Sequence, residues 1–152
     1  MSYENLYSLI NLAVVPAWLL LIILPKSEIT RKLVHSGVYP VVYGLFYFVL
    51  IVRSMFFGVA AEGASMSTLD GVMTMFTHPN SMVVGWAHYL VFDLFVGAWI
   101  SRDAIRRGMN HLMVIPCLFF TFMFGPIGLL MYVILRKVTS KGGLVLDEVE
   151  QT

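Results

Sequence analysis

Residues 85–95 read Gly85-Trp86-Ala87-His88-Tyr89-Leu90-Val91-Phe92-Asp93-Leu94-Phe95, and this stretch decides the fold class. It is apolar enough for a membrane helix, yet it contains a histidine and an aspartate. An aspartate at the centre of a membrane helix costs roughly 2.5–3.5 kcal/mol, so such a group usually faces a bundle interior or a wet cavity. The stretch therefore predicts a functional site at His88 and Asp93. The alternative is a structural role, in which these polar side chains form hydrogen bonds between helices.

The composition of the chain agrees with a membrane location. Hydrophobic residues make up 59% of the 152 residues and charged residues 12%, with a mean hydropathy of +0.82. Soluble domains carry about 25% charged residues, so the composition indicates a membrane protein. The length allows one compact bundle. A net charge of +1 does not indicate a protein that binds nucleic acid. The one cysteine, Cys117, excludes an internal disulfide and is expected to be a small core residue.

Four apolar stretches predict an all-α fold with four transmembrane helices in one bundle, because each has about the 20 residues that a helix needs to cross a membrane. Their approximate bounds are Asn5–Leu24, Leu33 or Gly37 to Val52, Ser81–Ile100 and Leu112–Leu135. Asn80 or Ser81 is the expected N-cap of the third helix. Together these stretches predict one transmembrane domain over residues 1–141, followed by a short acidic tail at 142–152 that is expected to be disordered.

The connection between the second and third stretches carries a shorter helical signal. Its apolar residues Leu69, Val72, Met73 and Phe76 recur at helical spacing. This pattern predicts a short amphipathic helix lying at the membrane interface. A helical plug packed on the bundle is the alternative.

Basic residues predict the orientation of the chain. Six of them lie in the connections after the first and third helices, and four lie on the other side: Arg53, Arg136, Lys137 and Lys141. The difference favours a multi-pass protein with the two basic connections in the cytoplasm and both termini outside.

The third helix distributes its polar groups over two faces. On a 3.6-residue period Trp86, Tyr89 and Asp93 lie near one face, whereas His88 lies with Phe92. His88 and Asp93 are about 140° apart around the axis, so each is expected to meet groups from other helices. Tyr89 can also reach Asp93 along the same helix.

Interior prolines suggest a cavity beside this helix. A proline inside a helix leaves the carbonyl four residues earlier without its usual donor, and in lipid that carbonyl needs another partner or a cavity. Three such prolines are Pro16, Pro116 and Pro126. We therefore predict a ligand cavity, with pairing without any void as the alternative. Its expected lining residues are Trp86, His88, Phe92 and Asp93, and Tyr89 is expected to contribute to ligand binding.

Several site classes are not indicated by the sequence. The four histidines, His35, His78, His88 and His111, do not form the repeated HxxxH and HxxHH clusters of membrane di-iron enzymes, and no CxxCH haem attachment or glycine-rich phosphate loop occurs. The sequence therefore predicts no metal and no cofactor. A histidine pair as haem ligands is a weaker alternative.

The run Gly85–Ile100 resembles the abscisic-acid-deficient-4-like, or neoxanthin synthase-like, family of small four-span membrane proteins. Further matching pieces are Pro16-Ala17-Trp18-Leu19-Leu20, Arg102-Asp103-Ala104 followed by His111 and Pro116, and Gly125-Pro126-Ile127-Gly128-Leu129-Leu130. The family is named for a plant plastid protein needed to make neoxanthin. Because this chain shows no Arg- and Ser-rich N-terminal extension, its expected location is the inner (plasma) membrane of a bacterium.

This resemblance implies a cofactor-free intramolecular isomerisation of an epoxy-carotenoid or related isoprenoid lipid. Opening an epoxide to an allenic alcohol requires a proton delivered to the epoxide oxygen and a proton removed from a nearby carbon. A protonated Asp93 could supply the first and a neutral His88 could accept the second. The alternative is a non-catalytic protein that binds a carotenoid, quinone or lipid, or that assists a partner enzyme. A homo-oligomer is compatible with either function.

Overall fold

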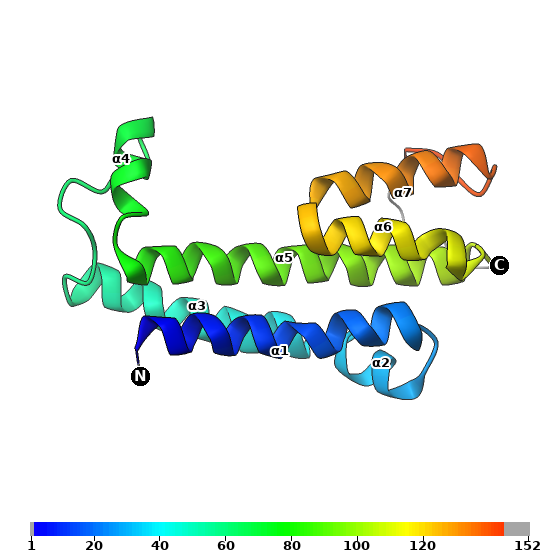
Figure 1. Ribbon diagram of the computed structural model, residues 1–152, viewed down its shortest axis with the longest axis horizontal. Helices are drawn as coiled ribbons and strands as arrows, with labels where there is room; N and C mark the ends of the chain where they lie inside the picture. Colours follow the sequence, from blue (N-terminus) through cyan, green and yellow to red (C-terminus); the bar gives the residue numbers. More distant parts are fainter. Residues whose placement is uncertain (1, 145–152) are drawn as a thin grey trace. The chain divides into compact units, whose positions relative to one another are not determined.

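The computed structural model describes residues 2–144 and is all-helical over that range. This confirms the predicted fold class at the level of secondary structure. The helices are α1 (Tyr3–Ile23), α2 (Glu28–Leu33), α3 (Val38–Phe56), α4 (Leu69–Met75), α5 (Pro79–Arg106), α6 (His111–Phe124) and α7 (Pro126–Val138) (Figure 1). The acidic tail predicted to be disordered falls, from residue 145 onward, outside the described residues.

The chain divides into two compact units, which we describe separately. Unit 1 comprises the residues up to Val14 together with Tyr39–Val91, and unit 2 comprises Val15–Val38 together with the residues from Phe92 onward. Helices α1 and α5 contribute residues to both units.

Within residues 2–144, three segments are long and apolar enough to cross a membrane. They are Tyr3–Ile23, Glu28–Phe56, which contains α2 and α3, and Pro79–Arg106, with mean hydropathies of 2.2, 1.6 and 1.5. The break between α2 and α3 falls at residues 34–37, directly after the six residues of α2. Ser27 caps α2 by accepting a hydrogen bond from the backbone N–H of Thr30.

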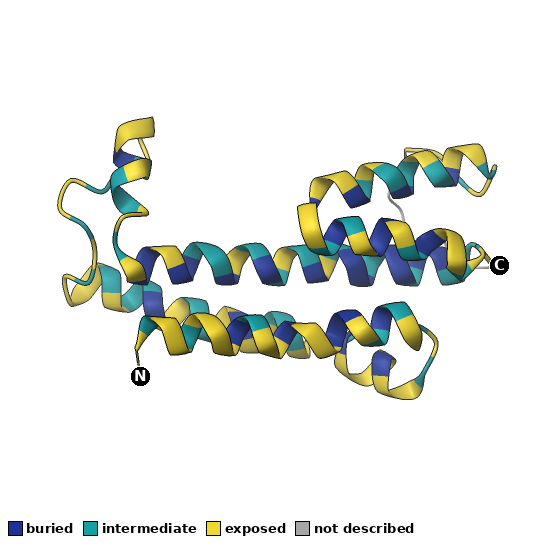
Figure 2. Cartoon of the chain, viewed as in Figure 1, coloured by how far each residue is buried: buried dark blue, intermediate teal, exposed yellow. Residues whose placement is uncertain are grey.

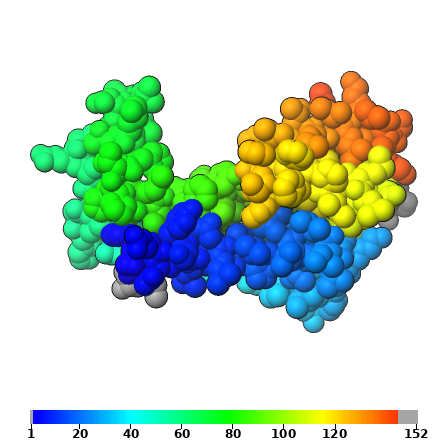
Figure 3. Space-filling view, in the orientation of Figure 1, coloured from blue at the N-terminus to red at the C-terminus, as the bar shows by residue number. Residues whose placement is uncertain are grey.

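The predicted fourth transmembrane helix is not one helix. The chain reverses at Gly125, and α6 and α7 lie side by side as a helical hairpin (Figures 1 and 3). Gly125 adopts φ +48°, where glycine is favoured, and Pro126 begins α7 at a position where its missing N–H costs little. At 14 and 13 residues the two helices are only about 20 Å long, too short to cross the hydrocarbon core. The prediction of a single span over Leu112–Leu135 is therefore wrong, and a four-span bundle is not confirmed.

Small residues let the helices of unit 2 approach closely. A Cβ at Gly128 would lie 2.1 Å from the Thr121 backbone nitrogen, so the backbones of α6 and α7 approach each other closely at this point. A Cβ at Gly97 of α5 would lie 2.5 Å from the buried Trp18 ring of α1. Buried residues are correspondingly dense along the C-terminal half of α5 (Figure 2). Cys117 is buried in α6, as predicted.

Tyrosines of α3 bond the backbone of α1 within unit 1. The Tyr43 hydroxyl donates to the Ile10 carbonyl, and the Tyr39 hydroxyl donates to the Ala13 carbonyl at 3.1 Å. These carbonyls lie three and six residues before Pro16, in the region where the proline was expected to leave a carbonyl without its usual donor. The carbonyl four residues before Pro16 is that of Leu12, whereas the tyrosines bond the carbonyls of Ile10 and Ala13.

Helix α5 begins at Pro79, earlier than predicted, so neither Asn80 nor Ser81 precedes it as an N-cap. Asn80 is instead fully buried, and its side-chain nitrogen donates to the Leu50 carbonyl at 3.1 Å and to the Ser54 hydroxyl at 2.7 Å. The amide thereby ties the first turn of α5 to the last turns of α3. The short helix predicted over Leu69–Phe76 is present as α4.

Candidate functional site

A mostly apolar pocket of about 610 Å³ lies within unit 1. It is formed by α3, the 57–68 connection, α4 and the first three turns of α5. Its lining residues are Tyr47, Ile51, Ser54, Met55, Ala60, Ala64, Ser65, Met66, Met75, Phe76, Ser81, Val84, Gly85 and His88. A volume of this size is within the range of small-molecule sites, and a few polar groups among apolar walls are typical of them.

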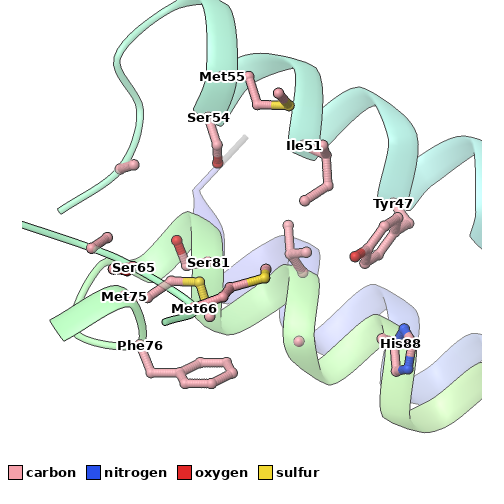
Figure 4. Close-up of a pocket in the computed structure, with 14 residues that line it drawn as sticks. Tyr47, Ile51, Ser54, Met55, Ser65, Met66, Met75, Phe76, Ser81 and His88 are labelled. Atoms are coloured by element: carbon pink, nitrogen blue, oxygen red, sulfur yellow. The ribbon is translucent and has the colours of Figure 1, made fainter. Parts of the chain in front are cut away.

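Two aromatic groups close one end of this pocket. The rings of Tyr47 from α3 and His88 from α5 lie 5.9 Å apart between centroids, at an interplanar angle of 48° (Figure 4). The phenol and the imidazole are the polar groups of that end. His88 is thus the one residue of the predicted cavity that lines the pocket.

Serines and methionines form the remainder of the pocket wall. Met66 and Met75 extend toward its centre from the connection and from α4 (Figure 4). Ser54 is held in place, because its hydroxyl donates to the Val59 carbonyl at 3.2 Å and accepts from Asn80. Unbranched methionines fill irregular space and adapt to different apolar ligands.

Glycines allow the 57–68 connection, α4 and α5 to pack closely around the pocket. Thr68 caps α4 by accepting from the Gly71 N–H, and the Gly71 carbonyl accepts from the Ser65 N–H at 3.2 Å. A Cβ at Gly71 would lie 2.7 Å from the Ser65 Cβ. On α5, a Cβ at Gly85 would lie 2.6 Å from the Phe76 ring. Neither position leaves room for a Cβ, so this pocket wall depends on glycine at both of them.

Trp86 and Tyr89 do not line this pocket. The Trp86 indole N–H donates to the Asn11 side-chain oxygen at 3.0 Å, and its ring packs on Tyr7 and Tyr89 at 5.7 and 5.2 Å between centroids. These contacts turn Trp86 toward α1. The ligand-binding roles predicted for Trp86 and Tyr89 stay predictions.

Asp93 lies in unit 2, against the turn of the hairpin. A Cβ added to Gly125 would be 2.5 Å from one Asp93 carboxylate oxygen, so the carboxyl group packs directly on this glycine. Gly125 is also the residue before α7, where an acidic group interacts favourably with the helix N-terminus. Phe92, on the neighbouring face, is 56% exposed. The catalytic role predicted for Asp93 and the ligand-binding role predicted for Phe92 stay predictions.

A comparison with models of protein families identifies the family of this chain. The family model described as ABA DEFICIENT 4-like matches residues 5–132. The chain belongs to this family. The match confirms the resemblance drawn from the Gly85–Ile100 run and from the motifs around it.

A plant relative gives a more distant comparison for this ABA DEFICIENT 4-like protein. The chain is 23% identical over 145 residues to Protein ABA DEFICIENT 4, chloroplastic, from Arabidopsis thaliana. The alignment covers 90% of the chain but 63% of the relative. No solved structure matches. Because the named relative is chloroplastic, the bacterial plasma membrane stays a prediction.

Unit 2 contains a buried ionic cluster that was not predicted from the sequence. Asp103, 1% exposed, accepts a hydrogen bond from the Tyr132 hydroxyl at 2.6 Å and pairs with Arg107 at 2.7 Å. The side chain of Arg136, also buried, lies 3.5 Å from the same carboxylate oxygen and over the ring of Trp99. This cluster joins α5 to α7. The predicted third helix ended at Ile100, before Asp103, and Arg136 was predicted on the opposite side of the membrane, so no contact between them was expected.

Within residues 2–144 no group of three or more His, Cys, Asp or Glu side chains is placed to hold a metal ion. The four histidines have separate surroundings. The ring nitrogens of His35 and His111 are within hydrogen-bond distance of the Pro25 and Ile22 carbonyls, whereas His78 contacts Tyr3 ring to edge. His88 is the histidine that lines the pocket described above.

Proposed function

We propose that this ABA DEFICIENT 4-like protein is an integral membrane protein that binds an isoprenoid lipid in the pocket closed by Tyr47 and His88. The observation that carries the proposal is the pocket itself, an apolar space bordered by helices apolar enough to cross a membrane. Its few polar groups suit a ligand with one polar end and a long apolar body. Met66, Met75 and Phe76 supply the adaptable apolar surface for that body.

A tryptophan at position 75 tests this binding site. Met75→Trp should fill part of the pocket and lower the amount of copurified isoprenoid lipid about tenfold. Forcing extra atoms into a filled space costs roughly 1–3 kcal/mol, and about 1.4 kcal/mol corresponds to a tenfold loss of affinity. Lipids extracted from the purified protein are quantified by mass spectrometry.

Met73→Trp is the matched control for this test. Met73 is on the same short helix, is exposed and does not line the pocket, so lipid content should be unchanged. Equal lipid content in Met75→Trp and the unmodified protein would exclude this pocket as the binding site.

The second candidate function is the cofactor-free isomerisation that the family resemblance implies. Its support in the structure is that His88, an acid–base side chain, borders the pocket. A neutral imidazole there can accept the proton lost from carbon during epoxide opening. Asp93 does not line this pocket, so its role as the proton donor to the epoxide oxygen stays a prediction that needs its own test.

Separate substitutions test these acid and base roles. His88→Gln should retain lipid binding but lower turnover of an epoxy-carotenoid by roughly 10²–10⁴-fold, since general acid–base catalysis contributes that much. Asp93→Asn should have an effect of the same order while keeping the fold. Product formation is followed by chromatography. Lipid binding by the unmodified protein with no conversion of any epoxide supplied would leave the binding function and exclude the isomerase.

A further inference from the structure

A second pocket, of about 390 Å³, lies within unit 2 and has a different character. It is located between the α1–α2 connection and the last turns of α5. Its lining residues are Pro25, Lys26, Ser27, Arg31, His35, Arg102, Ile105 and Arg106. Of these eight described residues, four are cationic and none is a carboxylate. A concentration of positive charge around a concave surface favours an anionic ligand.

The α1–α2 wall of this pocket is held in place by hydrogen bonds. The buried Thr30 hydroxyl donates to the Leu24 carbonyl at 2.6 Å, and Ser27 caps α2. The His35 ring nitrogen is 3.3 Å from the Pro25 carbonyl. These bonds close the 24–35 segment on itself, so Lys26 and Arg31 project from a preformed turn.

The α5 wall presents Arg102 and Arg106, which are one turn apart on the same face. The carboxylates of the neighbourhood only partly offset the positive charge. Glu28 pairs with Arg31 at 2.7 Å, and Arg106 lies 3.8 Å from the buried Asp103. Among residues 2–144, these two acidic groups stand against four lining cations.

The hairpin adds further positive charge to this end of unit 2. Because α7 returns toward the start of α6, Arg136 reaches Asp103, and the Arg107 guanidinium donates to the Lys141 carbonyl at 2.8 Å. Arg136, Lys137 and Lys141 thereby join the six basic residues at positions 26–32 and 102–107, and nine of the ten basic residues, all except Arg53, belong to unit 2. The positive-inside rule then favours this end in the cytoplasm, with the end of α7 beside it. The expectation of an outside C-terminus assumed a fourth membrane crossing.

We propose that this pocket binds the phosphate of an anionic lipid in the cytoplasmic leaflet. Arginine guanidinium groups donate paired hydrogen bonds that match phosphate oxygens, and lysine adds a point charge. Basic pockets between membrane helices on the cytoplasmic side bind lipid headgroups in this manner. The proposal shares the membrane location with the proposed function but does not depend on the His88 pocket.

Native mass spectrometry of the detergent-solubilised full chain tests this site. The protein is titrated with phosphatidylglycerol and, separately, with phosphatidylcholine of the same acyl chains. We expect a clear preference for phosphatidylglycerol and roughly fivefold weaker binding in Lys26→Gln, since each basic residue near a membrane surface contributes about that factor. Lys26 is exposed, so its substitution should leave the helical circular dichroism unchanged. Arg102→Gln should weaken binding at least as much.

Lys137→Gln is the matched control, because it removes one exposed charge from the same end without touching the pocket. Equal binding of the two lipids, or equal losses in Lys26→Gln and Lys137→Gln, would overturn the proposal. Displacement of phosphatidylglycerol by an equal concentration of inorganic phosphate would assign the site to a soluble anion instead.

Two further arms test the occupant and the leaflet. Asp147, Glu148 and Glu150 lie outside the described residues and could compete for the pocket as carboxylates. Phosphatidylglycerol selectivity that emerges only after truncation at Leu144 would assign the pocket to the tail.

A fluorescent protein fused after Thr152 should fluoresce in a bacterial inner membrane. An active periplasmic reporter at that position, without fluorescence, would contradict the cytoplasmic leaflet.

Discussion

Gly128→Ala should lower the stability of the protein by about 3 kcal/mol, the upper end of the usual cost of overpacking. The added Cβ would lie 2.1 Å from the backbone nitrogen and the hydroxyl of Thr121 and 2.4 Å from the Cys117 carbonyl oxygen. Backbone atoms of α6 cannot move aside as a flexible side chain would, so the hairpin must open. A loss of this size corresponds to a fall in Tm of about 6–12 °C. Thermal unfolding in detergent, followed by circular dichroism, measures it.

Gly44→Ala provides the control for the hairpin prediction. Gly44 is in the interior of α3, and a Cβ there meets nothing within 4 Å. The alanine should leave Tm unchanged or raise it slightly, because glycine in a helix interior is less favourable than alanine by about 0.5–1 kcal/mol. Similar Tm values for Gly128→Ala and Gly44→Ala would show that α6 and α7 do not approach as described.

Asp103→Asn is the second substitution with a large expected effect. It keeps the shape of the side chain but removes the negative charge between Arg107 and the buried Arg136. Removing one partner of a buried ion pair costs about 3–5 kcal/mol, because the remaining charge stays in a poorly solvated site. The same thermal unfolding experiment should show a fall in Tm comparable to that of Gly128→Ala.

A double substitution separates the charge effect from other causes. Arg136→Met removes a buried cation, so the Asp103→Asn loss should be smaller when it is made in the Arg136→Met background. The surface control is Asp70→Asn on the exposed first turn of α4, which should change stability by less than about 1 kcal/mol. Additive effects of Asp103→Asn and Arg136→Met would mean that the two groups are not coupled.

The helical class, most helix positions and the family could be predicted from the sequence. Apolar runs near 20 residues predicted α1, α3 and α5, and the spacing of Leu69, Val72 and Phe76 predicted α4. These features depend on local properties, because hydropathy and helical periodicity need no tertiary contact. Part of the candidate site could also be predicted, because His88 is an ionisable residue within an apolar run.

Other parts of the site could not be predicted in this way. Tyr47 and Met75 reach the pocket from elements that lie far apart in the chain, and nothing in their local sequence indicates a shared cavity. Trp86 was predicted to line it, yet the partner of its indole N–H is Asn11, 75 residues away. Which face of α5 borders the pocket depends on which helix packs on the other face, and that is a tertiary property.

The sequence by itself determined the helical composition, the apolar lengths and the charge near helix ends, because each follows from residues that are neighbours in the chain. The tertiary structure alone decided the direction of the chain after Gly125. A proline flanked by glycines is compatible with a kinked span or with a reversal, and the difference lies in whether α7 can pack on α6. The missing side chain of Gly128 permits that approach, and the attraction of Arg136 to the buried Asp103 favours it. The same reversal brings Arg136, Lys137 and Lys141 toward the six basic residues at positions 26–32 and 102–107 of unit 2.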